Sequence, residues 1–172
     1  MDFDKFYVAY KNALMREYNE NPHFEMIYKG RASYTELINK IMGNDITLTL
    51  SDDCKFDPEY FKIDYTWWKS RKSKEDEMNI YDWKLVCVVE HENEWNDWTY
   101  EVEKLDSIIA PLKIAIGFMP NDKRDIEAKY VEKQISKLKN KSVNQEFGII
   151  LMNRELDIES DDPFGFRTYL IK

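Results

Sequence analysis

Three acidic residues stand where two apolar stretches of the sequence end or are interrupted. The stretch from Leu85 to Val89 runs directly into Glu90 and Glu92. If it forms a strand, these two carboxylates share one face, because side chains alternate along a strand. Asp64 is a lone acid inside the apolar run FKIDYTWW, where a charge is costly unless it is compensated. Carboxylates completed by water and phosphate are typical ligands of Mg²⁺, so the pattern predicts a metal site if the two stretches pair.

The distribution of charge fits a metal site beside an anion-binding face. The net charge of the 172-residue chain is −8, which by itself counts against tight duplex binding, because phosphate contacts rely on clustered Lys and Arg. Residues 90–103 carry acids without any Lys or Arg, whereas residues 121–142 carry more basic than acidic residues. The alternative is that both segments are solvated helix faces, which is the usual role of such charge runs.

The composition is that of a folded protein of one domain. Hydrophobic residues make up 43% and aromatic residues 15% of the chain, and Gly and Pro are scarce. Cys54 and Cys87, with two His, show neither zinc-ligand spacing nor a disulfide framework. The N-terminal sequence is unlike a signal peptide, and no apolar run is long enough to span a bilayer. We therefore expect a cytoplasmic protein with no membrane contact.

Hydrophobic periodicity predicts two helices, then three strands, and then helices that alternate with strands. Ser33 and Glu36 form a capping box that opens the second helix, and Gly43-Asn44 ends it. Residues 19–30 and 52–59 are expected to be irregular. Helices are expected at residues 3–18, 33–43, 97–109 and 123–139. Strands are expected at residues 46–50, 61–68, 83–90, 112–118, 147–152 and 166–171.

This order predicts an α/β fold in which a mixed central sheet is flanked by helices. The strand at 83–90 is apolar on both faces, as in the interior of a covered sheet. A helix then leads to the strand at 112–118, which predicts a right-handed unit with parallel strands. We expect a single domain over residues 1–172, composed of an N-terminal helix and irregular segment (1–32), a core (33–118), and a basic helix with C-terminal strands (119–172).

An acid in one strand, acids at the end of the next strand, and then a helix and a parallel strand resemble the PD-(D/E)XK nuclease superfamily, which includes many restriction endonucleases. The resemblance covers about half of the chain and implies a restriction-endonuclease-like αβββαβ core. It also implies Mg²⁺ or Mn²⁺ on Asp64, Glu90 and the main-chain carbonyl of His91. The segments that carry it are Ile63-Asp64-Tyr65 and Val89-Glu90-His91-Glu92.

The sequence departs from the superfamily pattern at the lysine. Glu92 stands where these enzymes usually have Lys, and some restriction enzymes of the superfamily also carry Glu there. A lysine displaced to another position is the alternative. Lys104, on the following helix, and Lys84, at the start of the same strand, are the candidates. We prefer Lys104, because Lys84 is far from Glu90 along the strand.

Several further residues are secondary candidates. Glu17 falls on the apolar face of the first helix. Some relatives in the superfamily add a carboxylate from an N-terminal helix. The better interpretation of Glu17 is a residue of the last turn that reaches solvent. The His91 side chain is expected on the sheet face opposite Glu90. Trp95 is the tryptophan most expected to be exposed for stacking on a base. The basic helix would approach a phosphate backbone through Lys129, Lys133 and Lys137.

Two functions remain open at this point. The first is a metal-dependent phosphodiesterase acting on DNA, within a larger defence or repair system, in which Glu92 or Lys104 orients or deprotonates the attacking water. Without a separate recognition domain, its specificity would come from a homodimer or a partner protein. The second is a catalytically inactive binding or regulatory protein that keeps the nuclease fold.

Overall fold

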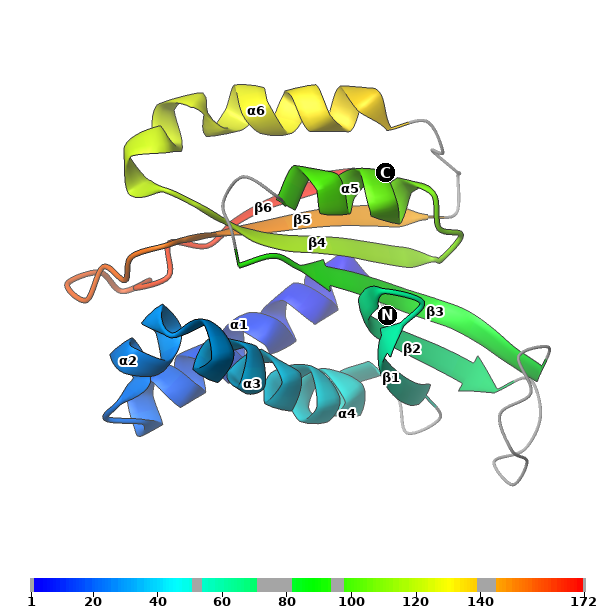
Figure 1. Ribbon diagram of the computed structural model, residues 1–172, viewed down its shortest axis with the longest axis horizontal. Helices are drawn as coiled ribbons and strands as arrows, with labels where there is room; N and C mark the ends of the chain where they lie inside the picture. The colour runs from blue at the N-terminus through cyan, green and yellow to red at the C-terminus, as the bar shows by residue number, and fades with distance from the viewer. Residues whose placement is uncertain (1, 51–53, 71–81, 94–97, 139–144, 172) are drawn as a thin grey trace.

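Six strands form one mixed sheet, and their order in space follows their order in the chain (Figure 1). The computed structural model describes residues 2–50, 54–70, 82–93, 98–138 and 145–171. Neighbouring strands are antiparallel from β1 to β3, parallel from β3 to β5, and antiparallel between β5 and β6. The strands are β1 (Cys54–Tyr60), β2 (Ile63–Ser70), β3 (Trp83–His91), β4 (Leu112–Met119), β5 (Glu146–Asn153) and β6 (Arg167–Ile171).

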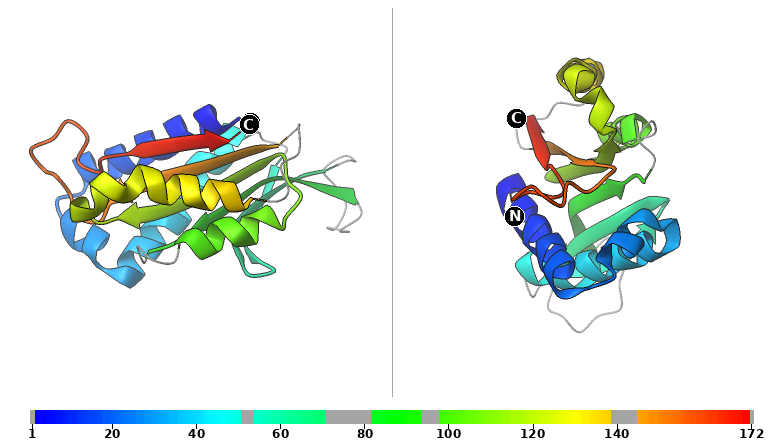
Figure 2. Two further views of the ribbon diagram at one scale, coloured as in Figure 1. Left: turned by 90° about the horizontal axis from the view of Figure 1, so that it is seen from above. Right: turned by 90° about the vertical axis from the view of Figure 1, so that its left-hand side faces the viewer.

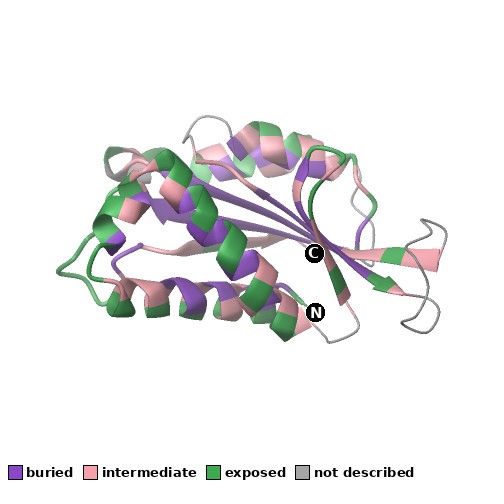
Figure 3. Cartoon of the chain, turned by 60° about the horizontal axis from the view of Figure 1, so that its bottom comes forward, coloured by how far each residue is buried: buried purple, intermediate pink, exposed green. Residues whose placement is uncertain are grey.

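The strand that carries Glu90 lies inside the sheet, as its two-sided apolar sequence predicts. β3 is bonded to β2 on one side and to β4 on the other. Its parallel partner β4 is buried along its whole length, since helices cover both of its faces (Figure 3). The expected α/β class with a mixed sheet and a parallel strand–helix–strand unit is therefore confirmed.

Helices cover both faces of the sheet, in two groups (Figures 1 and 2). One face is covered by α1 (Phe3–Glu20), α2 (Phe24–Lys29), α3 (Arg31–Ile41), the π-helical turn η1 (Met42–Ile46) and α4 (Thr47–Leu50). The other is covered by α5 (Trp98–Asp106) and α6 (Arg124–Lys137), with the 3₁₀ turn η3 (Asn121–Lys123) before α6. In the part of the chain that the structure describes, no helix has both the length and the apolarity needed to cross a bilayer.

The first helix forms where the periodicity of aromatic residues predicts it. Phe6, Tyr10 and Leu14 are fully buried and lie one turn apart along α1. The Asp2 side chain accepts a hydrogen bond from the Lys5 main-chain N–H at 3.0 Å and caps the helix. This aromatic face packs on the sheet opposite α5, so the two helix groups enclose β3 between them.

The region between α3 and β2 differs from the sequence-based prediction. Residues 46–50 are helical, and the strand predicted there is wrong. Gly43 does not end the helix, because the chain continues through η1 into α4. The hydroxyls of Thr47 and Thr49 donate to the carbonyls of Met42 and Asp45 at 3.0 and 2.8 Å, which satisfies acceptors inside the helix. The first strand is instead β1, within the segment expected to be irregular.

The predicted capping box is also wrong. The N-cap of α3 is Gly30, which leaves Ser33 inside the first turn. The Ser33 hydroxyl donates to the carbonyls of Ile27 and Gly30, at 3.1 and 3.2 Å. It therefore closes the junction with α2, a helix that lies within residues expected to be irregular.

A glycine sets how closely α5 approaches the sheet. A Cβ added at Gly117 in β4 would lie 2.6 Å from the Cβ of Trp98, the first residue of α5. The indole of Trp98 is fully buried against this point. This contact holds the first turn of α5 close against β4.

Candidate functional site

Asp64 and Glu90 face each other at one end of the sheet, where β2 begins and β3 ends. The antiparallel register sets Tyr65 opposite Val89, so the next pair along the ladder is Asp64 and Glu90. Side chains directly opposite each other lie on the same face. That face is the one covered by α5, since Val88 also packs there. The hairpin thus brings together the two acids that the sequence placed in separate strands.

Glu90 is a buried carboxylate with an incomplete set of partners. Its exposed fraction is 1%. Its Oε1 lies 2.7 Å from the Nζ of Lys104, which comes from α5. Within the described residues, the ion pair with Lys104 is the close contact made by Oε1, and Oε2 is buried without a hydrogen-bond partner of good geometry. A buried acid with oxygens left over has capacity to bind another polar or positively charged group.

The basic group beside Glu90 is delivered by the helix that follows it. The Lys104 Nζ also lies 3.3 Å from Glu101, one turn earlier on α5. Burial by itself lowers the pKa of Lys104, but the ion pairs with Glu90 and Glu101 together raise it. Lys104 is therefore a cation and a hydrogen-bond donor at neutral pH. Glu101 was not singled out from the sequence, although its i,i+3 spacing from Lys104 was a signal for such a pair.

The main chain at His91 also points toward this end of the sheet. The His91 N–H donates to Oδ2 of Asp64 at 2.8 Å. The N–H of the next residue, Glu92, donates instead to the Ile116 carbonyl on the β4 side, at 2.9 Å. Because the N–H and C=O of one strand residue point to the same side, the His91 carbonyl is directed to the side of Asp64.

The imidazole of His91 lies on the opposite face of the sheet, as predicted. Its Nε2 lies 3.1 Å from the hydroxyl of Tyr10 and 3.2 Å from that of Tyr34. Burial lowers the pKa of His91 to about 4, so the ring is neutral. These contacts with α1 and α3 fix the residue whose main chain meets Asp64.

The pKa values of both acids are raised. For Asp64 the largest cause is burial, which the His91 N–H and the charge of Lys104 oppose. For Glu90 the largest cause is again burial, and the charges of Asp64 and Glu101 add to it against the effect of Lys104. Two acids with raised pKa values in one cleft are the environment in which a cation gains most from binding.

A pocket of about 410 Å³ opens beside the two acids. It lies between α3 on one face of the sheet and α5 on the other, at the end of the β1–β2 hairpin. It is lined by Arg31, Thr35, Ile38, Asn39, Pro58, Glu59, Asp64, Tyr65, His91, Glu92, Asn93 and Glu101. A substrate in this pocket would contact Asp64 directly, with Glu90 behind it.

Glu92 and Lys84, the other residues considered for the role of the superfamily lysine, differ from Lys104 in position. Glu92 lines the same pocket as Asp64, but its charge is not among the causes of the raised pKa values of Asp64 and Glu90. Lys84 is paired in register with Lys69, near the opposite end of β3. Of the three candidates, Lys104 is the one for which the structure gives a contact with the buried acid, at 2.7 Å.

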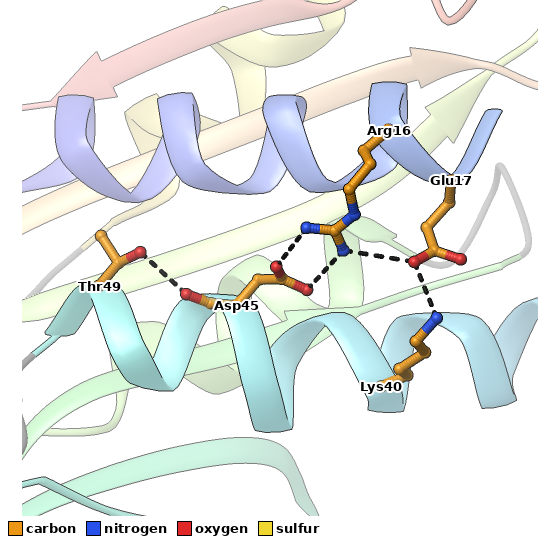
Figure 4. A network of polar contacts seen from close by, with 5 residues as sticks. All are labelled: Arg16, Glu17, Lys40, Asp45 and Thr49. Carbon is orange, nitrogen blue, oxygen red and sulfur yellow. Dashed lines mark hydrogen bonds and ion pairs between the residues drawn. The ribbon is translucent and has the colours of Figure 1, made fainter. Parts of the chain in front are cut away.

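Glu17 belongs to a separate polar network (Figure 4). Its carboxylate accepts from Lys40 at 2.8 Å and from Arg16 at 3.3 Å. Burial alone raises the pKa of Glu17, but the contacts with Lys40 and Arg16 lower it overall. Arg16 also holds Asp45. The network joins α1 to α3 and η1 and does not include the acids of the pocket.

The residues expected to contact nucleic acid lie on α6 or beyond the described chain. Lys129, Lys133 and Lys137 are exposed on α6, and Lys137 is paired with Glu103 of α5 at 3.2 Å. Trp95 lies outside the described residues.

The ligand set fits a hard cation that keeps water. Among the side chains that the structure describes, no group of three or more His, Cys, Asp or Glu is placed to hold a metal ion. The carboxylates of Asp64 and Glu90 and the main-chain carbonyl of His91 remain as candidate ligands, and Oε2 of Glu90 is buried without a hydrogen-bond partner. Mg²⁺ and Mn²⁺ accept such small sets because waters and substrate phosphates complete their octahedron. The residues present therefore fit either ion.

Comparisons with known proteins place the chain in no family. No family model matches it, and neither the curated proteins nor the solved structures contain a significant match.

The raised pKa of Glu90 predicts how stability depends on pH. Because the folded state binds the proton more tightly than the unfolded state, the free energy of unfolding in metal-free buffer should fall as pH rises from 4.5 to about 9. Each unit by which the pKa of Glu90 is higher in the folded than in the unfolded state is worth about 1.4 kcal/mol. Glu90→Gln should flatten this slope in urea titrations followed by tryptophan fluorescence.

The matched control for this titration is Glu103→Gln, which removes an exposed carboxylate from the same helix as Lys104. It should leave the slope unchanged. Equal slopes for wild type and Glu90→Gln would contradict the assignment of the raised pKa.

Proposed function

We propose that the protein is a metal-dependent phosphodiesterase that acts on DNA, with a restriction-endonuclease-like core. The observation that carries this proposal is the grouping of Asp64, Glu90 and Lys104. Two acids with raised pKa values face each other at the end of paired strands, and a lysine Nζ lies 2.7 Å from the buried acid. This is the acid–acid–lysine set that the resemblance implies, with the lysine supplied by α5.

The topology around the site supports the same proposal. The meander β1–β2–β3, the crossover helix α5 and the parallel strand β4 follow the αβββαβ order when the helices that precede β1 are counted as its first element. The second and third strands carry the acids, and the crossover helix carries the lysine.

Each residue has a role that follows from its surroundings. Asp64, Glu90 and the His91 carbonyl would hold Mg²⁺ or Mn²⁺, which supplies an acidified water and neutralises charge on the phosphate. Lys104 stays protonated, because its ion pairs raise its pKa. It therefore orients the attacking water and donates to the developing negative charge, and another group takes up the proton. We assign that task to Glu92, which lines the pocket beside Asp64.

The direct test is the response of the wild-type protein to Mn²⁺. Excess Mn²⁺ at pH 8 should raise the melting temperature relative to EDTA, and the same ion should support cleavage of a fluorescently labelled DNA substrate. Ligand at 100 times its dissociation constant stabilises by about 2.7 kcal/mol. The shift should grow with pH, because the ion binds the deprotonated acids. A melting temperature that Mn²⁺ leaves unchanged would contradict the metal site.

The alternative is a nuclease-fold binding or regulatory protein without catalysis. One observation favours it: Lys104 already pairs with both Glu90 and Glu101, as in a structural ion-pair network. A protein of this kind would be indifferent to chelators.

A further inference from the structure

The turn between β1 and β2 adopts a conformation that its residues disfavour. Tyr60 pairs with Ile63, so Phe61 and Lys62 form a two-residue loop. Their φ angles are 50° and 65°. Positive φ at both central residues defines a type I′ turn, for which Asn-Gly is the preferred sequence. A bulky aromatic and a long cation take these positions at a conformational cost.

The residue before the turn adds to this cost. Glu59, next to Pro58 at the end of β1, also has a positive φ of 57°. Left-handed non-glycine residues persist only where the surrounding structure enforces them, and they concentrate at functional sites. Three of them within four residues therefore call for a function that depends on the side chains themselves.

The aromatic at the turn is held outward by a chain of ring contacts. Phe61 is 78% exposed, although it is a large apolar residue. Its ring centroid lies 4.7 Å from that of Tyr60, and Tyr60 lies 4.9 Å from Trp68 in the same edge-to-face manner. Trp68 is buried. These ring contacts connect Phe61 through Tyr60 to the buried Trp68 and hold the Phe61 ring in solvent.

The turn also adjoins the pocket of the acids. Pro58 and Glu59 line that pocket, and Asp64 follows two residues after Lys62. In the view from above in Figure 2, the teal hairpin extends outward past the helices beside it. A substrate whose phosphate lies at Asp64 would pass directly alongside Phe61 and Lys62.

We propose that Phe61 and Lys62 form a contact for single-stranded or locally unpaired DNA. The face of Phe61 stacks on an unpaired base, and Lys62 pairs with an adjacent phosphate. An exposed aromatic beside a cation is the combination that binds single strands, whereas the stacked bases of a duplex offer no free face. This rests on the proposed phosphodiesterase and specifies its substrate class.

Equilibrium binding of a fluorescent single-stranded oligonucleotide in EDTA tests the contact without cleavage. Phe61→Ala should weaken binding about 5- to 160-fold, the range for one stacked base, and Phe61→Trp should preserve it. Binding of a duplex of the same sequence should change little. The control is Ile158→Ala, which removes an apolar side chain that is 68% exposed in the loop before β6. It should leave oligonucleotide binding unchanged.

A second variant separates the conformational cost from the function. The double change Phe61→Asn and Lys62→Gly supplies the residues that a type I′ turn prefers. It should raise the melting temperature by about 2–6 °C while weakening single-strand binding at least as much as Phe61→Ala. A gain in stability with binding unchanged would overturn the proposal.

The outcomes also separate this contact from the metal site. Absence of single-strand binding by wild type, or binding independent of Phe61, overturns the contact and leaves the response to Mn²⁺ to decide the phosphodiesterase. Binding that depends on Phe61 without any response to Mn²⁺ supports the contact and contradicts the phosphodiesterase. If Phe61→Ala changes the sedimentation coefficient and not oligonucleotide binding, the turn is a protein interface and the proposal is wrong.

Discussion

Above pH 9, where Glu90 is ionised, Lys104→Met should destabilise the metal-free protein by about 2–4 kcal/mol, because it leaves the buried carboxylate without its cation. Methionine keeps most of the length and flexibility of the lysine side chain, so loss of packing contributes little. Since 24% of the Lys104 side chain is exposed, the cost should fall below that of a fully buried pair. Denaturation in urea with EDTA measures it.

The same variant should respond to Mn²⁺ more strongly than wild type, because the ion then replaces the missing positive charge. Cleavage of DNA should nevertheless fall by about 10²-fold or more, because the donor to the developing charge is gone. Glu90→Gln combined with Lys104→Met should recover most of the stability, because no charge is left unpaired. A Lys104→Met protein as stable as wild type in EDTA would show that the ion pair contributes nothing measurable.

Asp64→Asn should cost little stability in EDTA, and stability and function should move in opposite directions. The asparagine side chain keeps an oxygen that accepts from the His91 N–H, a bond of 2.8 Å in the wild-type protein. The change also removes a charge that raises the pKa of Glu90. Stabilisation by Mn²⁺ should disappear, because the ion loses a charged ligand, and DNA cleavage should become undetectable.

Thermal melting of wild type and Asp64→Asn, each with EDTA and with excess Mn²⁺, gives four melting temperatures. They decide whether Asp64 is a metal ligand or a structural acid. The control is Asp57→Asn, which changes an acid in the neighbouring strand that does not line the pocket. A structural role for Asp64 would instead give a loss of about 1–3 kcal/mol in EDTA with any response to Mn²⁺ retained.

The sequence predicted the part of the sheet that holds the acids because strong patterns act there. β3 is apolar on both faces, and β4, β5 and β6 have clear apolar runs bounded by turns. Asp64 was identified because a charge interrupts an apolar strand. The pairing with Glu90 followed from the meander, and the preferred lysine, Lys104, is the one that contacts Glu90.

The errors lie where local patterns are ambiguous. The alternation in ITLTLS is typical of a strand, but Thr47 and Thr49 use their hydroxyls to satisfy helix carbonyls, and Ile46 packs in the core from a π-helical turn. β1 was missed because Asp57 and Pro58 are turn residues by propensity, and only its position at the edge allows Pro58 in a strand. Glu101 could not be assigned without knowing which face of α5 meets β3.

The edge strand β1 has a consequence for self-association. An open edge with regular N–H and C=O groups is a template for pairing with another chain. In β1 that template is interrupted, because Pro58 has no N–H and the positive φ of Glu59 turns the main chain out of the extended conformation. Two copies of the chain are therefore hindered from joining their sheets continuously along β1.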